Sequence, residues 1–339
     1  MTADALGDGY DGGEYDSDGY GDDGYDGGEY DSGARNRTFL VDHREQVRMV
    51  EDGWTPGDTP QIGVVADDVT DDSIRAAGSG TLAGEDGATD ESAGAGEREE
   101  ALEDALTALG GSPEVVTGTP AEVRDAAPDL VVAVGDRALS SLARLENAVD
   151  APILPVSTSA GVAPVALADV QEAVNAFVRS EATITHHPLV SVVVDGSVVS
   201  RAVFDVSLVT DEPAQISEYS VHSRGSALAT FRADGVVAAT PAGSHAYAAA
   251  ASGPSLSAAV NALSVVPIAP FTTRTRHWVV PDDDLTLAVE RDEVAVSLCV
   301  DDRCLESVGV GTAVSIRIDP ERALACLETP VSRGPFTGP

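Results

Sequence analysis

The sequence contains no lysine, and all 20 of its basic residues are arginines. Without lysine the chain cannot contain a Walker-type phosphate loop, and it cannot form a Schiff base through a lysine amine. The 57 acidic residues give a formal net charge of −37, so no basic stripe is available to neutralise nucleic-acid phosphates. We therefore expect no nucleic-acid partner.

Cysteine is almost as scarce, with only Cys299, Cys304 and Cys326. Their number and spacing fit neither a disulfide framework nor a paired zinc motif, and we interpret Cys299 and Cys304 as ordinary strand residues flanking a turn at Asp301-Asp302. No apolar run reaches the 18 residues that a membrane helix needs, and no signal peptide is recognisable. We expect a soluble, cytoplasmic protein without a membrane partner.

The acidic residues are partly concentrated, with eleven in residues 1–33 and eleven in residues 67–100. The motif DGYDGGEYDS at residues 8–17 recurs at residues 23–32 and has no period that could bury its tyrosines. We predict a disordered Gly/Asp/Tyr-rich tail and linker over residues 1–58. The remaining acidic residues are dispersed, which suits a halophilic cytoplasm where concentrated salt screens self-repulsion.

Residues 59–185 have the pattern of an α/β nucleotide-binding domain, with an acidic, Gly/Ala/Ser-rich loop inserted at about 67–96. Short apolar strands alternate with helices, which favours a small parallel sheet. The strands are expected at 61–66, 114–117 and 129–134, and the helices at 98–109 and 120–127. The strand at 129–134 is apolar throughout, as is typical of a buried parallel strand.

Residues 186–325 have the pattern of a β-rich domain, and residues 326–339 that of a loose tail. Asp195-Gly196 between two apolar runs predicts a tight hairpin. Further strands are expected near 203–210, 216–221, 227–232, 236–240, 264–268, 277–280, 285–290, 294–300, 304–308 and 313–318. Helices are expected at 246–251 and through 256–263.

The segment from Phe231 to Asp284 is the centre of this domain. A strand ends in the small-residue loop Thr240–Ser244, which leads into an alanine-rich helix. This geometry directs free backbone N–H groups at one spot, where anions bind. The alternative is a tight strand-to-helix connection in which Ser244 is the N-cap and no ligand is present.

Several short motifs in this region occur in a family-specific order. They are Ala233-Asp234-Gly235, Thr240-Pro241-Ala242-Gly243-Ser244-His245-Ala246-Tyr247, Ser252-Gly253-Pro254, Pro267-Ile268-Ala269-Pro270 and Pro281-Asp282-Asp283. Together they resemble the NAD kinase family, which is related to diacylglycerol kinases and phosphofructokinases. The resemblance covers about residues 60–320 and implies an α/β N-terminal domain followed by a β-rich NAD-binding domain.

Earlier family motifs are degenerate here. Where the family has Gly-Gly-Asp-Gly-Thr, this chain has Val134-Gly135-Asp136-Arg137-Ala138, and the family's Asn-acid pair corresponds to Phe204-Asp205. The run from Pro152 to Gly161 lacks an asparagine and one glycine of its family counterpart, and His245 stands in a threonine position.

The resemblance implies transfer of the terminal phosphoryl group of ATP (or polyphosphate) to the 2′-hydroxyl of the adenosine ribose of NAD, with Mg²⁺ bridging the phosphates. Asp136 occupies the position of the family's base; the alternative is a capping aspartate after a buried strand. Gly135 would let backbone N–H groups approach a phosphate. Arg137 would either fork onto phosphate oxygens or lie at the surface.

The remaining candidates are implied to bind the dinucleotide: Asp205, Asp234, Thr240, Gly243, Ser244, His245 and Tyr247. Asp205 would contact the ribose or adenine, while Phe204 would either stack on a ring or fill the core. His245 would donate to a phosphate or ribose oxygen, or face solvent. Tyr247 would line the nucleotide pocket or pack on the sheet, and Asp234 would contact substrate or only shape its turn.

The sequence thus predicts an NAD kinase that uses ATP and Mg²⁺, in a family that commonly forms homodimers and homotetramers. The rival hypothesis is a catalytically inactive relative that binds NAD(P)(H) or another nucleotide as a regulator, which the loss of two glycines around Asp136 favours. A third hypothesis is phosphoryl transfer to a different hydroxyl.

Overall fold

The computed structural model describes residues 47–49, 60–66, 113–212, 215–271, 276–292 and 294–335, with the backbone alone at 47–49. The acidic insertion, the helix at 98–109 and most of the predicted disordered tail and linker lie outside the described residues; residues 47–49 of that predicted tail and linker form a strand that pairs with residues 183–185. None of the described helices is long and apolar enough to cross a membrane.

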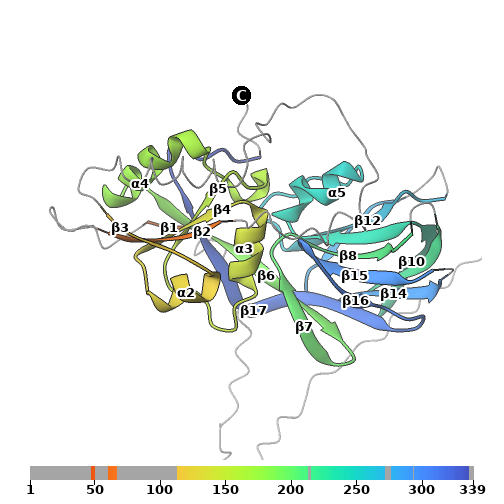
Figure 1. The fold of residues 1–339 in the computed structure, drawn as a ribbon. Helices are drawn as coiled ribbons and strands as arrows, with labels where there is room; N and C mark the ends of the chain where they lie inside the picture. The colour runs from red at the N-terminus through yellow and green to blue at the C-terminus, as the bar shows by residue number, and fades with distance from the viewer. Residues whose placement is uncertain are drawn as a thin grey trace, which may run out of the picture. The chain divides into compact units, whose positions relative to one another are not determined.

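The α/β half is built on a parallel sheet with the strand order β3-β2-β4-β5 (Figure 1). Its strands are β2 (Gln61–Ala66), β3 (Glu114–Thr117), β4 (Leu130–Val134) and β5 (Ile153–Val156). Its helices are α2 (Pro120–Asp125), α3 (Asp136–Ala143) and α4 (Val170–Val178), with short 3-10 turns η2 (Ala160–Val162) and η3 (Leu167–Asp169). The predicted parallel α/β architecture is confirmed.

Helices cover both faces of this sheet, which is why every residue of β4 is buried. Side chains of α4 pack on one face, against Leu130 and Val132, whereas α2 and α3 pack on the other, against Val131 and Ala133. Figure 1 shows α4 and α2 on opposite sides of the strands. Burial on both faces explains the unbroken apolar run that the sequence displays.

The β-rich half is a pair of packed sheets. The six-stranded sheet has the order β13-β12-β11-β8-β15-β16 and is antiparallel throughout. Its strands are β8 (Asp205–Thr210), β11 (Gly235–Ala239), β12 (Ala262–Ile268), β13 (Trp278–Pro281), β15 (Val296–Val300) and β16 (Arg303–Ser307). Buried side chains of this sheet, such as Leu208 and Leu298, pack against Tyr219 and Leu287 of the other sheet.

The second sheet is shared with the α/β half. It contains β1 (Val47–Met49), β6 (Thr183–Val194), β7 (Ser197–Ala202), β9 (Ser217–Ser223), β10 (Ser226–Ala233), β14 (Leu285–Arg291) and β17 (Ala313–Glu328), together with β2 to β5. The long strand β17 pairs antiparallel with β6 and parallel with β5. Because β17 continues to Glu328, residues 326–328 belong to the sheet and not to the loose tail that the sequence predicts.

The predicted hairpin at Asp195-Gly196 is confirmed. Both turn residues have positive φ, 50° and 78°, which is the signature of the turn that matches the twist of paired strands. The predicted helix through 256–263 is wrong, because residues from Ala262 onward pair with both β11 and β13 as β12. The predicted helix at 246–251 is shorter than expected, since α5 spans only Tyr247–Ala250 after the 3-10 turn η4 (Gly243–His245).

The interpretation of two cysteines is also wrong. Cys299 of β15 and Cys304 of β16 lie directly opposite each other in the strand pair and are joined by a disulfide. The two cysteines are five positions apart in the sequence, on either side of the tight turn at Asp301, whose φ is 52°. Cys326 is a free, buried thiol in the end of β17, with its pKa raised to about 12 by burial and then by Glu328.

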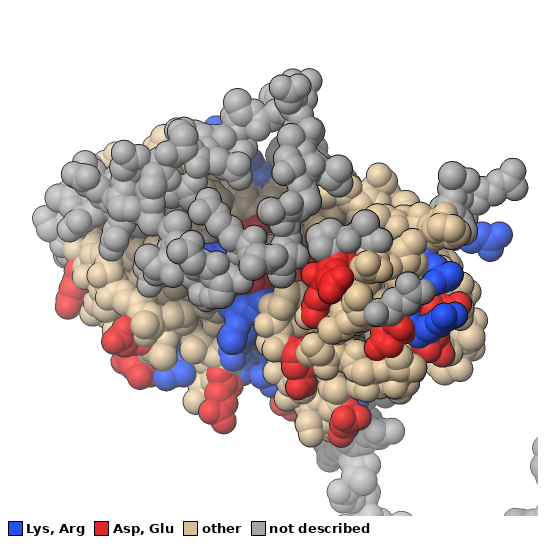
Figure 2. Space-filling model, turned by 45° about the vertical axis from the view of Figure 1, so that its right-hand side comes forward, with Lys and Arg blue, Asp and Glu red and all other residues tan. Residues whose placement is uncertain are grey.

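Acidic side chains are spread over the face of the molecule drawn in Figure 2, with arginines interspersed. On this face no single patch of the described residues gathers the negative charge. This distribution agrees with the dispersed acidity of the sequence outside its two acidic segments.

Candidate functional site

The aspartate predicted as the base lies where β4 meets α3. Gly135 has φ 87° and ψ 161°, a conformation that side-chain-bearing residues adopt only at a cost, and α3 starts with the next residue, Asp136. Ser159 donates two hydrogen bonds to the carboxylate, from its N–H to Oδ1 at 2.7 Å and from its Oγ to Oδ2 at 2.5 Å. Both oxygens are therefore held, and the carboxylate has a fixed orientation.

The residues after Asp136 replace the family's glycine-containing loop. Ala138 is 2% exposed and packs with the core between α3 and the sheet. Arg137 lies half-buried in the first turn of α3. The chain thus passes from β4 into α3 through Gly135 alone.

The loop after β11 is closed by its own hydroxyl groups. Thr240 donates from Oγ1 to the carbonyl of Val203 at 2.6 Å and accepts the N–H of Gly243 at 3.1 Å. Ser244 donates from Oγ to the carbonyl of Pro241 and accepts the N–H of Leu256, both at 2.8 Å. Ser244 is therefore not the N-cap of α5, because its hydroxyl ties the loop to the following segment instead.

Two glycines let other backbone segments touch this loop. A Cβ on Gly243 would lie 2.0 Å from the carbonyl oxygen of Phe204, and a Cβ on Gly161 would lie 1.9 Å from the carbonyl oxygen of Ala242. Both distances are far below van der Waals contact, so neither position accepts a side chain without movement of backbone. The loop from Thr240 is thus held between the start of β8 and η2, which comes directly after Ser159 in the chain.

The side chain of Phe204 fills the core. It is 4% exposed and belongs to the same buried cluster as Leu139 and Leu142 of α3. Of the two interpretations of this residue, core filling is therefore the one that the structure supports. The hydrogen-bonding amide that the family has at this position is absent, and Phe204 does not replace it with an exposed aromatic face.

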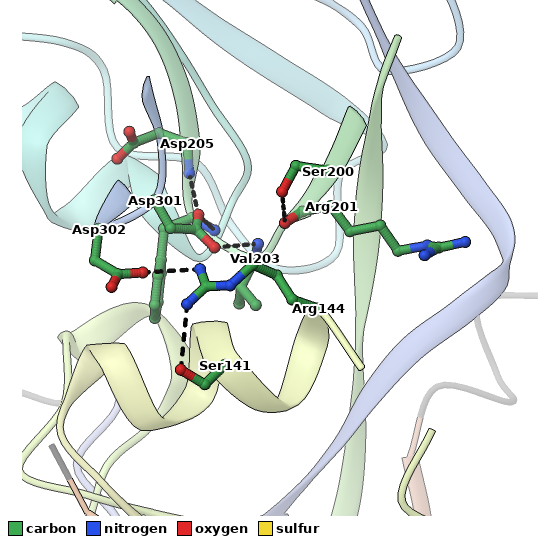
Figure 3. Close-up of polar contacts among 9 residues, drawn as sticks. Ser141, Arg144, Ser200, Arg201, Val203, Asp205, Asp301 and Asp302 are labelled. Carbon is green, nitrogen blue, oxygen red and sulfur yellow. Dashed lines mark hydrogen bonds and ion pairs between the residues drawn. The ribbon is translucent and has the colours of Figure 1, made fainter. Parts of the chain in front are cut away.

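Asp301 organises the backbone at the start of β8 (Figure 3). Its Oδ2 accepts the N–H of Val203 at 3.0 Å, and its Oδ1 accepts those of Phe204 at 2.8 Å and Asp205 at 3.0 Å. Burial raises the pKa of the Asp301 carboxyl, although the three N–H donors act in the opposite direction. Asp301 thus fixes the position from which the side chain of Asp205 projects.

Asp205 itself is 6% exposed and lies among negative charges. Burial, followed by the charges of Asp301 and Asp136, raises the pKa of the Asp205 carboxyl well above its ordinary value. In Figure 3 the carboxyl group points away from the hydrogen bonds that Asp301 makes to the backbone. Asp136 of the α/β half and Asp205 of the β-rich half therefore interact electrostatically.

Tyr247, Asp234 and His245 lie at the edge of this group. Tyr247 is 43% exposed, and burial, followed by the charges of Asp205 and Asp234, raises the pKa of its hydroxyl. Asp234 is partly exposed, and burial raises its pKa. Nε2 of His245 lies 3.2 Å from the carbonyl oxygen of Leu256. Tyr247 thus offers an accessible ring beside the two aspartates.

An ion pair joins the two halves next to these residues. Nη1 of Arg144, at the C-terminal end of α3, lies 2.8 Å from Oδ1 of Asp302, and its Nη2 donates to Oγ of Ser141 at 3.2 Å (Figure 3). Both partners are largely buried, with exposed side-chain fractions of 16% and 18%. The pair links α3 to the turn that carries Asp301.

Sequence reasoning missed Ser159, Asp301, Asp302 and Arg144. Ser159 is 23 positions from Asp136, in the run from Pro152 to Gly161 that has a family counterpart, but the sequence does not connect it with Asp136. Asp301 and Asp302 have the composition of an ordinary turn, and only their place at the end of an apolar strand could have drawn attention to them. The described residues contain no group of three His, Cys, Asp or Glu side chains that could hold a metal ion.

A cavity behind the loop is too small for a nucleotide. It is lined by Pro241, His187, Asn261 and Asp282 among others and has a volume of about 20 Å³, which suits a single water-sized molecule. Burial and then the neighbouring His186 lower the pKa of His187 to about 4. His187 is therefore a neutral core residue at physiological pH.

The fold and the site define a two-part α/β and β-rich protein whose candidate residues converge from both halves. Residues 204–318 match the family model of the ATP-NAD kinase C-terminal domain. The chain is 33% identical to the NAD kinase of Methanosarcina barkeri over 193 residues, which cover 53% of this chain and 68% of the relative. It is 32% identical to the NAD kinase of Methanosarcina acetivorans over 196 residues, 55% of this chain and 69% of the relative.

Solved structures share the fold. Yeast NADH kinase complexed with NADH superposes with a TM-score of 0.57 at 17% identity, covering 80% of this chain and 84% of that one. An NAD kinase from Archaeoglobus fulgidus in complex with ATP superposes with a TM-score of 0.55 at 19% identity, covering 80% and 94%. The chain belongs to the NAD kinase family.

Proposed function

We propose that the protein is an ATP-dependent NAD kinase that phosphorylates the 2′-hydroxyl of the adenosine ribose of NAD to give NADP. The observation that carries the proposal is the Asp136 carboxylate, which comes after a buried parallel strand and is oriented by both donors of Ser159. Asp205 and the loop from Thr240 to Tyr247 supply the opposite side of the site. Membership of the NAD kinase family supports the same reaction.

In this reaction Asp136 accepts the proton of the 2′-hydroxyl while the ribose oxygen attacks the terminal phosphorus of ATP, and ADP leaves. Ser159 keeps the carboxylate aimed at the hydroxyl, and the rigid loop closed by Thr240 and Ser244 presents its backbone to the dinucleotide. Tyr247 offers its exposed ring to the substrate. Orientation of this kind supplies much of the rate enhancement in phosphoryl transfer.

Mg²⁺ enters this scheme only as an ion bound to the phosphates of ATP. The described residues provide no three-ligand set, so we assign it no protein ligands. Mg²⁺ commonly reaches such sites bound to the phosphates of the nucleotide, where it neutralises their charge. We assign no step of the reaction to the metal.

A regulatory relative without catalysis is the second candidate, because Arg137 and Ala138 replace residues that leave the family's phosphate loop open. Ala138 packs in the core, and the turn is reduced to Gly135. Such a protein would bind NAD(P)(H) through the loop from Thr240 but transfer no phosphoryl group.

The deciding experiment uses the purified full chain in concentrated KCl with ATP, Mg²⁺ and NAD, and measures NADP formation. We expect NADP to accumulate and Asp136→Asn to abolish turnover while NAD still raises the melting temperature. Absence of turnover in the unmodified protein, together with stabilisation by NAD, would overturn the kinase and support the regulatory relative. Light scattering in the same buffer tests the dimer or tetramer that we propose by analogy with the family.

A further inference from the structure

The distance between Asp136 and Asp205 depends on contacts between the two halves of the molecule. Asp136 is the first residue of α3, an eight-residue helix that spans about 12 Å. Asp205 is the first residue of β8. The side chains of Asp136 and Asp205 interact electrostatically, but an interaction between two acidic groups does not hold them at a fixed separation. Some other contact has to set it.

A short chain of polar contacts connects the far end of α3 to Asp205. Arg144 comes directly after the last residue of α3 and pairs with Asp302 at 2.8 Å, while Ser141 holds the other guanidinium nitrogen at 3.2 Å. Asp302 is covalently next to Asp301, whose Oδ1 holds the N–H of Asp205 at 3.0 Å. The ion pair of Arg144 with Asp302 and the hydrogen bonds of Asp301 thus connect α3 to Asp205, in addition to the packing of Phe204 against α3.

The same end of α3 has a second tether, to the large sheet. The guanidinium of Arg322 in β17 donates to the carbonyl of Leu145 at 2.5 Å and to that of Glu146 at 2.6 Å. These bonds hold the segment after α3 but do not reach the turn at Asp301. The pair of Arg144 and Asp302, in contrast, joins the helix to the residues that position Asp205.

The geometry points to Arg144 and Asp302 as positioning residues that set the separation between Asp136 and Asp205 and thereby the productive geometry of the site. The inference rests on the proposed function, since it assigns these residues to the reaction carried out between Asp136 and the substrate. Neither residue is assigned contact with the substrate. Their effect on turnover comes from the placement of α3 against β8.

The test compares Asp302→Asn, a nearly isosteric change that removes the charge, with Arg144→Lys, which keeps the charge but loses the planar guanidinium that contacts Asp302 and Ser141 together. Arg179→Ala is the control, because Arg179 pairs with Glu181 on the surface of the α/β half, with exposed fractions of 54% and 51%. Each variant is assayed for kcat, for KM of NAD and of ATP, and for melting temperature.

We expect Asp302→Asn to lower kcat about ten- to hundredfold with KM changed less than about threefold, since misplacement by about 1 Å costs catalysis more than binding. Arg144→Lys should lower kcat less than Asp302→Asn does, and Arg179→Ala should match the unmodified protein. An unchanged kcat in Asp302→Asn, with or without a lower melting temperature, would overturn the inference.

The proposed function can fail separately. If the unmodified protein makes no NADP, the kinase assignment is wrong, and the positioning role, which concerns turnover, is wrong with it. If the unmodified protein makes NADP and Asp302→Asn keeps the kcat of Arg179→Ala, only the positioning role is wrong. The rise in melting temperature caused by NAD should be similar in Asp302→Asn and Arg179→Ala, and a rise reduced by half or more in Asp302→Asn alone would mean that the pair serves binding and would also overturn the positioning role.

Discussion

Substitution of Gly161 by alanine tests whether the loop from Thr240 is held in place by backbone contact. The new Cβ would lie 1.9 Å from the carbonyl oxygen of Ala242, 2.6 Å from its carbonyl carbon and 2.7 Å from its Cα. Ordinary contact starts at about 3.4 Å, so η2 and the loop have to separate by about 1.5 Å. Every atom in the clash is backbone, and no side chain can rotate away.

Overpacking of this kind costs about 1–3 kcal/mol of unfolding free energy. The loop also loses its position relative to Asp136, because Gly161 lies two residues after Ser159, which holds that carboxylate. A displacement on the order of 1 Å is enough to reduce turnover about a hundredfold. We therefore expect Gly161→Ala to lower both the stability and the rate of NADP formation.

The assay measures urea unfolding, NAD-induced stabilisation and NADP formation for Gly161→Ala beside Gly309→Ala. The control position is open, since a Cβ on Gly309 would meet only Oγ1 of Thr312 at 3.9 Å. If Gly161→Ala kept the unfolding free energy within about 0.5 kcal/mol and the rate within about twofold of the control, the loop would not be held by this contact.

Three further predictions concern buried polar groups. Folding raises the pKa of Asp205, so this carboxyl favours the folded state at low pH, and its contribution is lost as pH rises through the folded pKa. Asp205→Asn should therefore raise the unfolding free energy at pH 7 and flatten its dependence on pH, both measured by urea unfolding. Folding lowers the pKa of His187 from 6.5 to about 4, so stability should fall by about 3 kcal/mol as pH drops through this range, and His187→Gln should remove the fall. Thr240→Val removes the hydrogen bonds to Val203 and Gly243 and should lower the unfolding free energy measured in urea by about 1–3 kcal/mol. A change near zero would mean that the hydroxyl does not hold the loop.

The sequence predicted those elements whose local pattern and tertiary environment agree. The apolar run that forms β4 is buried on both faces, and Asp195-Gly196 has turn chemistry that only a tight hairpin uses. The segment from Thr240 to Tyr247 stood out because its small residues and its order among other motifs are specific to one family. In each case the signal lies within a few adjacent residues.

The features that the sequence did not reveal depend on contacts between distant residues. The stretch from Asp319 to Arg322 contains a proline and has the composition of a strand end. Strand β17 nevertheless continues past an irregularity there, because β6 pairs with it both before and after this stretch. Ser159 meets Asp136 only after two strands are placed side by side. Residues 256–261 have helical composition, but the pairing of β12 with two neighbours makes the residues from Ala262 onward a strand.

The path of β17 has a consequence for how the protein is made. Synthesis proceeds from the N-terminus, so β2 to β5 leave the ribosome long before residues 313–328. Until then that side of β5 is covered only by the short bridge between Val156 and Val165, since β17 is the strand that pairs with β5 there. The nascent α/β half therefore exposes an open sheet edge to chaperones and to other chains throughout synthesis of the β-rich half. Any truncation before Ala313 would remove β17 and leave that side of β5 without its strand partner.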